Sequence, residues 1–399
     1  MELNIDKTGW KKVKFGEVCR QVNETARNPQ EEGLIHVVGL EHIGSNDLHI
    51  RSWNTLERET TFTRKFVKGQ VLFGRRRAYQ AKVAYANFDG ICSGDILVFE
   101  AIKSKLLPEL LPFMVQSQKF YNKAVETSAG SLSPRTKFKD LADLEFLLPP
   151  KDQQARLAEL LWAADEVVER EKEVKEKIHN FKISSMSTLL NGKYLINNNI
   201  ECPPNWKLMK LSQLGRVGTS GVDKKNEIGE QDVNLLNYMD VYRSFSKKIT
   251  SDIEFMKVTA KPNQIINNQL QLGDVLFTPS SETNDDIGHS AVVYEDLPNT
   301  LYSYHLVRLS FDVEIDLDFK RFMFNNPSVM AYFANRSKGV TRMTLGLDDF
   351  NNLTVLVPPL DEQKSIAQKL SDIDLSIINL MNQISTSIKL KQGLINEIF

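Results

Sequence analysis

A run of three arginines at residues 75–77 carries the side chains of this sequence that are best suited to binding. The run follows Val71 to Phe73, a short apolar segment after a turn glycine that predicts a buried strand. Three consecutive guanidinium groups on a loop cannot all be buried, and each can donate two parallel hydrogen bonds to a phosphate or to the edge of a guanine base. The loop could also be a solvated turn that stabilises a nearby carboxylate. We favour a contact with DNA, and the candidates on this loop are Arg75, Arg76, Arg77, Tyr79 and Lys82.

Three further segments carry basic or polar side chains of related kinds. Basic residues follow the flexible Gly130-Ser131 pair, and a similar group surrounds Gly339. Residues 278–286 hold hydroxyls and an amide that can read base edges, whereas their acidic neighbours repel phosphate unless they accept hydrogen bonds from cytosine amines. The candidates in these segments are Arg135, Lys137, Thr278, Ser280, Ser281, Asn284, Arg336, Lys338 and Arg342.

No convincing catalytic motif accompanies these candidates, so we expect neither a catalytic residue nor a cofactor bound by this chain. The sequence has no Gly-x-x-x-x-Gly-Lys-Ser/Thr phosphate loop, and three glycines between residues 215 and 221 have the wrong spacing for a dinucleotide fingerprint. The Pro149-Pro150 and Pro358-Pro359 pairs lack the polar neighbour that would hold a target amine in a DNA amino-methyltransferase. The three histidines between residues 36 and 49 fit no zinc spacing, so no metal site is predicted.

Composition and charge are those of an ordinary globular protein. The 399 residues are 41% hydrophobic and 25% charged, which provides material for two or three domains. A net charge of −1 is not the basic balance of a domain that binds nucleic acid by charge alone, so basic residues must gather on one face if DNA is the partner. Three cysteines without a C-x-x-C pair predict reduced, structural thiols. We expect a cytoplasmic protein, because the sequence shows neither a membrane-spanning apolar run nor a signal-peptide pattern.

An internal repeat of about 200 residues sets the predicted architecture. Trp10-Lys11 recurs as Trp206-Lys207, 196 residues later, and the apolar segment before the arginines recurs after 204 residues. The Pro149-Pro150 pair recurs as Pro358-Pro359 after 209 residues. The drift in spacing places short insertions in loops, and the repeat predicts two similar domains.

Each copy of the repeat ends in a long helical pattern that begins directly after its proline pair. Residues 152–154 (Asp-Gln-Gln) and 361–363 (Asp-Glu-Gln) open the two patterns, and acidic residues suit the positive end of a helix dipole. A helix of nearly 40 residues with a narrow apolar seam needs a partner helix, and the natural partner is its own repeat. Charges such as Glu171 with Lys175 predict a solvated helix face, although Glu171 also falls where a seam residue is expected.

The predicted fold class is a duplicated mixed α/β (α+β) domain, with the two copies separated by two long antiparallel coiled-coil helices. We place the first domain at residues 1–150, its helix at 151–192 and a polar linker at 193–205. The second domain occupies residues 206–359 and its helix residues 360–399. Such a helix pair would hold the domains a fixed distance apart, in a dumbbell with approximate twofold symmetry.

The doubled sequence of a Trp-Lys strand, a Gly-x-Val-Leu-Phe strand, a glycine loop and a Leu-x-Pro-Pro-x-Asp-x-Gln helix start resembles the specificity subunit of type I restriction-modification systems. The resemblance covers essentially the whole chain, and Val38 to Ile43 with its diverged counterpart at residues 236–241 adds to it. It implies that each domain is a target-recognition domain that reads one part of a bipartite double-stranded DNA site.

The same resemblance implies that the long helices bind DNA adenine-methyltransferase subunits, and that a restriction subunit that translocates DNA joins this core. S-adenosylmethionine and ATP would be used by those partners and not by this chain, which would itself be non-catalytic. A rival hypothesis is a coiled-coil scaffold whose end domains bind protein, against which the arginine run argues. A nuclease or methyltransferase would need the motifs that the sequence lacks.

Overall fold

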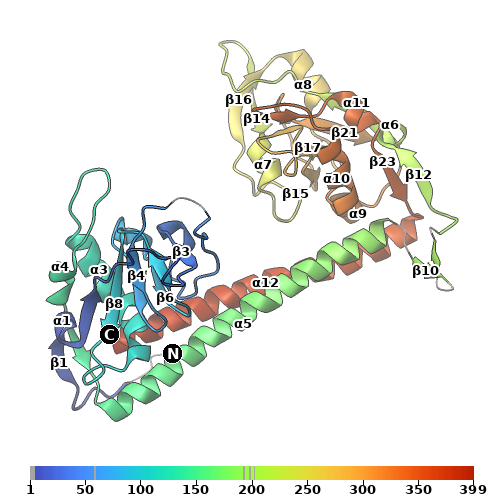
Figure 1. Ribbon diagram of the computed structural model, residues 1–399. Coiled ribbons are helices and arrows are strands. Elements are labelled where there is room, and N and C mark those ends of the chain that lie inside the picture. Colours follow the sequence, from blue (N-terminus) through green and yellow to red (C-terminus); the bar gives the residue numbers. More distant parts are fainter. Residues whose placement is uncertain (1–4, 58–59, 192–193, 197–198, 202) are drawn as a thin grey trace. The chain divides into compact units, whose positions relative to one another are not determined.

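The computed structural model describes residues 5–57, 60–191, 194–196, 199–201 and 203–399 (Figure 1). The chain forms two compact units: the first comprises Met1–Lys172 with Asn382–Phe399, and the second comprises Glu173–Met381. Each unit contains a mixed α/β domain and parts of both long helices, so the predicted duplicated fold class is confirmed. Among the described residues, none of the helices combines the length and apolar character that crossing a membrane requires.

The first unit is built on two small sheets and a strand pair. The four-stranded antiparallel sheet has the order β2-β8-β5-β6, from Cys19–Val22, Ile96–Ala101, Val71–Gly74 and Val83–Tyr85. The three-stranded sheet has the order β3-β7-β4, from His36–Val38, Gly90–Cys92 and Arg64–Phe66, and β1 (Lys11–Lys14) pairs with β9 (Glu145–Leu148). The short helices are α1 (Phe15–Val18), η1 (Leu40–His42), η2 (Ala78–Gln80), η3 (Pro108–Leu110), α2 (Leu111–Gln116), α3 (Gln118–Glu126) and α4 (Phe138–Ala142).

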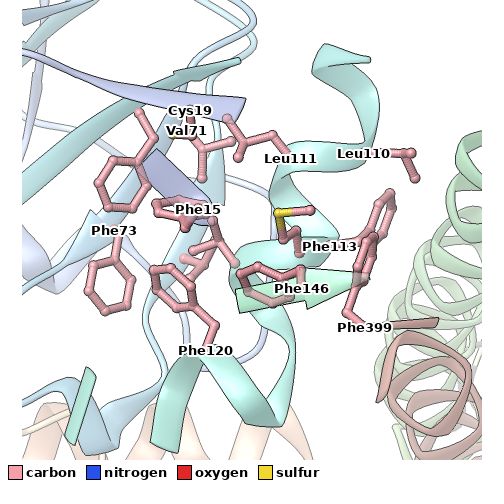
Figure 2. Close-up of a cluster of buried hydrophobic side chains, with 14 of the residues drawn as sticks. Phe15, Cys19, Val71, Phe73, Leu110, Leu111, Phe113, Phe120, Phe146 and Phe399 are labelled. Atoms are coloured by element: carbon pink, nitrogen blue, oxygen red, sulfur yellow. The ribbon is translucent and has the colours of Figure 1, made fainter. Parts of the chain in front are cut away.

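The core of the first unit is rich in phenylalanine and includes the end of the chain. Phe15 makes edge contacts with Phe99 and Phe120, at ring-centroid distances of 5.5 and 5.1 Å. Figure 2 shows Phe399, which is 8% exposed, beside the same cluster, and its ring lies 6.3 Å from that of Phe146. The C-terminal turns of the second long helix are therefore part of the first unit's core.

The second unit repeats this plan with additional strands. Its five-stranded sheet has the order β13-β21-β17-β19-β15, from Gly215–Thr219, Val307–Phe311, Val275–Phe277, Ser290–Val293 and Lys248–Ile249. Its other pairings are β16-β14-β20 (Met256–Ala260, Gln231–Leu236, Thr300–Tyr302), β12-β23 (Lys207–Lys210, Thr354–Val357) and β18-β22 (Ser280–Ser281, Met343–Thr344). The short helices are α6 (Leu211–Leu214), α7 (Tyr238–Tyr242), α8 (Pro262–Asn268), α9 (Leu317–Met323), α10 (Pro327–Arg336) and α11 (Leu347–Asn351).

The two long helices are α5 (Lys151–Leu190) and α12 (Leu360–Ile398), and the glutamine of each predicted opening trio fastens its helix to the domain before it. Gln154 donates to the Pro149 carbonyl (3.0 Å) and accepts from the Leu107 amide (2.8 Å). Gln363, 209 residues later, donates to the Pro358 carbonyl (2.8 Å) and accepts from a backbone amide (2.8 Å). The equivalent contacts explain why a glutamine stands at both helix starts.

Within each unit the segments of α5 and α12 run antiparallel, and one ion pair is repeated, buried in the first unit and partly exposed in the second. In the first unit Lys391 on α12 donates to Asp165 on α5 (2.7 Å), with side chains 5% and 3% exposed. In the second unit Lys182 on α5 lies 2.5 Å from Asp374 on α12. Lys391 lies 209 residues after Lys182, and Asp374 lies 209 residues after Asp165. The two units therefore use the same helix register. An ion pair between two packed helices can specify their register.

Glu171 and the predicted linker differ in how the structure bears on them. The expectation that Glu171 lies on a solvated face is wrong, whereas its expected place at the seam is confirmed. Its side chain is 9% exposed and accepts hydrogen bonds from Gln383 (2.9 Å) and Ser387 (3.0 Å) of α12. The predicted linker, 193–205, falls partly on residues 193, 197, 198 and 202, which lie outside the described residues. Within it, β10 (Tyr194–Ile196) pairs antiparallel with β11 (Asn199–Glu201).

The predicted reduced thiols are present at the two described cysteines. Cys19 and Cys92 are both free and buried, and burial raises the pKa of the Cys92 thiol to about 12. Cys202 lies outside the described residues. These thiols have the environment of core residues.

Candidate nucleic-acid interface

The first loop pair, which we define as residues 75–82 and 129–137, joins two of the candidate segments. Arg76 and Arg135 face each other in an isolated antiparallel bridge, and the Arg77 amide donates to the Pro134 carbonyl (2.9 Å). Ala129 and Arg135 exchange backbone hydrogen bonds of 3.1 and 3.0 Å, which closes the intervening turn. Gly130 (φ 121°) begins that turn in a conformation that side chains disfavour. Segments whose paired residues lie 57 and 59 positions apart in sequence thus form one surface feature.

Three arginines of the first loop pair, Arg75, Arg76 and Arg135, act on a single carboxylate, Asp95. Arg135 donates to both Asp95 oxygens (2.6 and 3.1 Å), while Arg76 lies 3.6 Å from Asp95 and donates to the Ser133 hydroxyl (3.2 and 3.0 Å). The hydrogen bond from Arg135 holds the pKa of Asp95 below its usual value against the opposing effect of burial, and the charge of Arg135 adds to the lowering. Three cations against one anion leave a local positive surplus.

Arg75 is the most confined member of this group. It is half-buried, and within the described part of the chain its Nε atom has no hydrogen-bond partner. Burial, followed by the charges of Arg64 and Arg135, lowers the pKa of its guanidinium. This arginine therefore adds to the positive potential at the base of the loop rather than extending into solvent.

The remaining candidates of the first loop pair differ in availability. Arg77 is exposed, Tyr79 is 63% exposed and Lys137 is exposed. Lys82 is half-buried, and its ammonium donates to the Leu40 carbonyl (2.6 Å). We therefore leave Lys82 out of the proposed contact surface, because its charge is already engaged within the domain.

The second loop pair, residues 278–289 and 336–344, has the same backbone plan. Lys338 and Thr344 exchange backbone hydrogen bonds of 3.0 and 2.9 Å, and the turn again begins with a glycine, Gly339 (φ 147°). Ser280 faces Thr344 in the strand pair β18-β22, as Arg76 faces Arg135 in the first unit. The two loop pairs can thus be aligned residue by residue.

This alignment shows an exchange of donor and acceptor between the two units. In the second unit Arg342 donates to the Ser280 hydroxyl at 3.2 and 3.0 Å, the same distances as between Arg76 and Ser133. The serine now stands on the strand loop and the arginine on the glycine loop. Each unit therefore has an arginine–serine contact between its two loops. The arginine stands on the strand loop in the first unit and on the glycine loop in the second.

Other candidates of the second loop pair are buried or exposed to different extents. Thr278 is fully buried and Ser281 is 8% exposed, so both are removed from the proposed contact surface. Their burial follows from the strand β17 and the pair β18-β22, which extend the packed core by one or two residues into the predicted loop. Asn284, Arg336 and Lys338 are exposed, and the Arg336 guanidinium lies 5.6 Å from the Tyr332 ring centroid.

Sequence reasoning missed an aromatic and charged group beside the second loop pair. Tyr238 donates to the Ser280 carbonyl (2.6 Å) and its ring stacks on that of Tyr242 at 5.8 Å. Asp286 accepts from the Tyr242 hydroxyl and interacts with His289, both at 2.7 Å. Although burial raises it, these hydrogen bonds lower the pKa of Asp286 overall. The Leu236 to Val241 segment matched in the repeat was the one sequence signal that pointed here.

A possible metal-ligand group is already neutralised by cations. Oxygen and nitrogen atoms of Asp47, His49 and Glu169 lie within 4.8 Å of one another. Arg51 lies 3.0 Å from Asp47 and 2.6 Å from Glu169, and Lys172 bridges the same two carboxylates at 3.3 and 2.9 Å. These residues form an ion-pair network between the domain and α5, which leaves little negative charge for a metal.

Two repeated α/β units that share two long helices define an internally duplicated chain with one loop pair in each unit. The chain belongs to the family of type I restriction-modification specificity subunits: the model of the type I restriction modification DNA specificity domain matches residues 7–180 and again 203–390. The predicted family is thereby confirmed.

Individual relatives agree with this assignment. The chain is 23% identical over 308 residues to the MjaVIII type I specificity subunit of Methanocaldococcus jannaschii, covering 71% of this chain and 68% of that one. It is 26% identical over 165 residues to the EcoDI type I specificity subunit of Escherichia coli, covering 38% and 36%. The chain thus spans less than half the length of some curated relatives that it matches: the matched part covers 36% of one relative and 46% of another.

A solved chain from work on complex assembly and conformational transition of the type I restriction-modification system shares the fold. Its TM-score is 0.65 at 18% identity, and the match covers 98% of this chain and 97% of that one. The likeness therefore extends over both units and both long helices.

Proposed function

We propose that the chain reads a bipartite double-stranded DNA site, one part with each unit, and docks DNA adenine-methyltransferase subunits on its long helices. The observation that carries the proposal is the pair of matched loop scaffolds with unlike chemistry. The first displays arginines around one carboxylate, whereas the second displays Ser280, Asn284 and an acidic, tyrosine-rich neighbourhood. Equal scaffolds with different donors and acceptors suit two readers of different base sequences.

The near-neutral charge of the chain is consistent with DNA contacts that are divided between this chain and its partner subunits. A net charge of −1 provides little sequence-independent affinity, which depends on how many phosphates a protein neutralises. We therefore propose that the loop pairs supply selectivity, and that methyltransferase subunits supply much of the phosphate contact. Methylation and, where a restriction subunit joins, cleavage would take place on those partners, with this chain as the non-catalytic member.

Docking of methyltransferase subunits is supported by apolar side chains that the helices leave in solvent. In the first unit Leu160 and Val167 of α5 are 45% and 49% exposed, and their spacing of seven residues places them on one helix face. In the second unit Val174 and Phe181 of α5, also seven apart, are 45% and 62% exposed. Regularly spaced apolar residues in solvent are typical of a surface that another protein covers.

The test is a competition gel shift with the chain assembled with its methyltransferase. Sequence-selective retardation of some genomic fragments over composition-matched ones is expected, and Lys137→Ala and Lys338→Ala should each reduce the slope of log affinity against log salt by about 0.9 if each lysine contacts one phosphate. Retardation of no fragment over another would refute DNA reading and favour the coiled-coil scaffold. Unchanged slopes in both variants would remove the two glycine loops from the interface.

A further inference from the structure

We infer that Arg77 is the residue with which the first unit reads a guanine, an inference that rests on the proposed function and names the base contact of its first loop pair. Unlike the other arginines of the loop pair, Arg77 has an exposed guanidinium that no group in the described part of the chain engages. Arg76 and Arg135 are engaged by Ser133 and Asp95, and Arg75 is half-buried. Within the described residues, the Arg77 side chain is exposed and makes no hydrogen bond or ion pair.

The backbone at Arg77 is held in a conformation that an arginine rarely adopts. Its φ of 53° lies in the left-handed region, and Ala81 at the other end of the same turn has a φ of 50°. Left-handed residues other than glycine persist only where the surrounding structure imposes them, and they cluster at functional positions. The strain therefore requires contacts that hold the turn, and these contacts are present.

Hydrogen bonds from three other segments brace the turn. The Arg77 amide donates to the Pro134 carbonyl (2.9 Å). The Ala81 carbonyl accepts from the Asn46 amide (3.0 Å) and from the Tyr121 hydroxyl (3.3 Å). A side chain presented from a braced turn has a defined direction, and such preorganisation matters for reading a base edge more than for meeting a phosphate.

The neighbouring charges keep the Arg77 guanidinium free to face outward. Asp95, the carboxylate of this loop pair, already accepts two hydrogen bonds from Arg135, and the guanidinium of Arg76 stands beside it. These cations repel Arg77 from the base of the loop. Tyr79, two residues along the same turn, is also exposed (63%).

Guanine is the base whose edge matches this donor. In the major groove guanine presents two acceptors, O6 and N7, to which a guanidinium donates two parallel hydrogen bonds, whereas adenine and cytosine each present an amino donor. The aligned position in the second unit is Ser281, which is 8% exposed. A guanine read in this way is therefore expected in only one of the two parts of the site.

The experiment maps methylated sites for the chain assembled with its methyltransferase, using wild type, Arg77→Lys, Arg77→Ala and Arg27→Lys. Arg27 is another exposed arginine of the first unit, outside the loop pair, and serves as the matched control. We expect the wild-type site to contain a guanine in the part read by the first unit. Arg77→Lys should reduce the preference for that guanine by roughly ten- to a hundred-fold, because lysine keeps the charge but not the fork. The other part of the site, and Arg27→Lys, should be unaffected.

Three results would overturn the inference. The first is a wild-type site without guanine in that part, and the second is an unchanged preference in both Arg77 variants. The third is normal selectivity in Arg77→Lys with a loss of affinity for all sequences in Arg77→Ala, which is the behaviour of a phosphate contact. A wild-type complex that shows no sequence preference would instead refute the proposed function itself.

Discussion

Lys391→Met should destabilise the first unit strongly, because it removes the cation from a buried ion pair. The Lys391 and Asp165 side chains are 5% and 3% exposed and 2.7 Å apart. Methionine retains much of the apolar stem of lysine, so the change leaves the packing and deletes the charge. Asp165 would remain buried with His49 (2.7 Å) as its other partner. Breaking a buried pair from one side costs about 3–5 kcal/mol, because the remaining charge is uncompensated.

The cost of Lys391→Met should depend on pH through His49. Hydrogen bonding to Asp165 raises the pKa of His49 against the opposing effect of burial. A raised histidine pKa contributes stability that is fully present below its unfolded value of about 6.5 and is lost as pH rises through the folded pKa. Protonated His49 can partly replace the lost lysine, so the variant should be less impaired at pH 5.5 than at pH 8.5.

Asp165 itself should stay ionised across this range. Although burial raises it, the hydrogen bond from His49 and the charge of Lys391 hold the pKa of Asp165 below its usual value. Stability from a lowered carboxylate pKa is present above the unfolded value of about 3.9 and is lost only as pH falls through the folded pKa. The pH dependence between 5.5 and 8.5 therefore reports on His49.

Hydrogen–deuterium exchange of the full chain measures this effect where it occurs. Peptides from residues 151–172 and 382–399 should lose about 3–5 kcal/mol of protection in Lys391→Met, while those from residues 207–357 should not change. Lys389→Met, at an exposed position of the same helix, should alter protection by less than about 0.5 kcal/mol. Equal effects of the two substitutions would refute the claim that the Lys391 pair holds the helices together.

Three further predictions concern other parts of the chain. Arg77→Gly should leave the melting temperature of the first unit almost unchanged, because relief of the left-handed strain and the added freedom of glycine in the unfolded chain are each about 1 kcal/mol and opposite in sign; a large loss would show that the side chain is structural. Phe399→Ala should cost about 3 kcal/mol in the first unit and nothing in the second, as exchange protection would show, since its ring packs on Phe146. Val167→Glu should weaken methyltransferase binding at least ten-fold in a titration without unfolding the chain; normal binding would remove this face of α5 from the docking surface.

The repeat and the helix starts could be read from the sequence because they depend on local patterns. Proline pairs end a strand, and a following polar trio with periodic apolar residues begins a helix, which the structure shows at Lys151 and Leu360. The same spacing of 209 residues that separates the two trios also separates Lys182 from Lys391. Their ion pairs could not be assigned in advance, since the antiparallel register between helices is set by tertiary packing.

The loop chemistry was less predictable because it depends on contacts between distant segments. Arg135 and Asp95 are 40 residues apart. Only the fold shows that Arg135, one of the predicted DNA-binding residues, is already hydrogen-bonded to Asp95. Thr278 and Ser281 looked like loop residues but continue the packed core, since β18 pairs with β22. Glu171 looked solvated from its charged neighbours, but polar residues of α12 accommodate it. For Arg135 and Ser281 the partner lies too far along the chain for periodicity or spacing to reveal it, whereas the apolar period had already placed Glu171 at a seam position.

The proposed division of labour between the two units is tested most directly by exchanging residues 1–150 for the corresponding domain of a relative with a different specificity. Methylated adenines would then be mapped in DNA modified by the assembled complex. One part of the recognised site should change while the other part stays as in the wild type. A change in both parts, or in neither, would contradict the reading of one part by each unit.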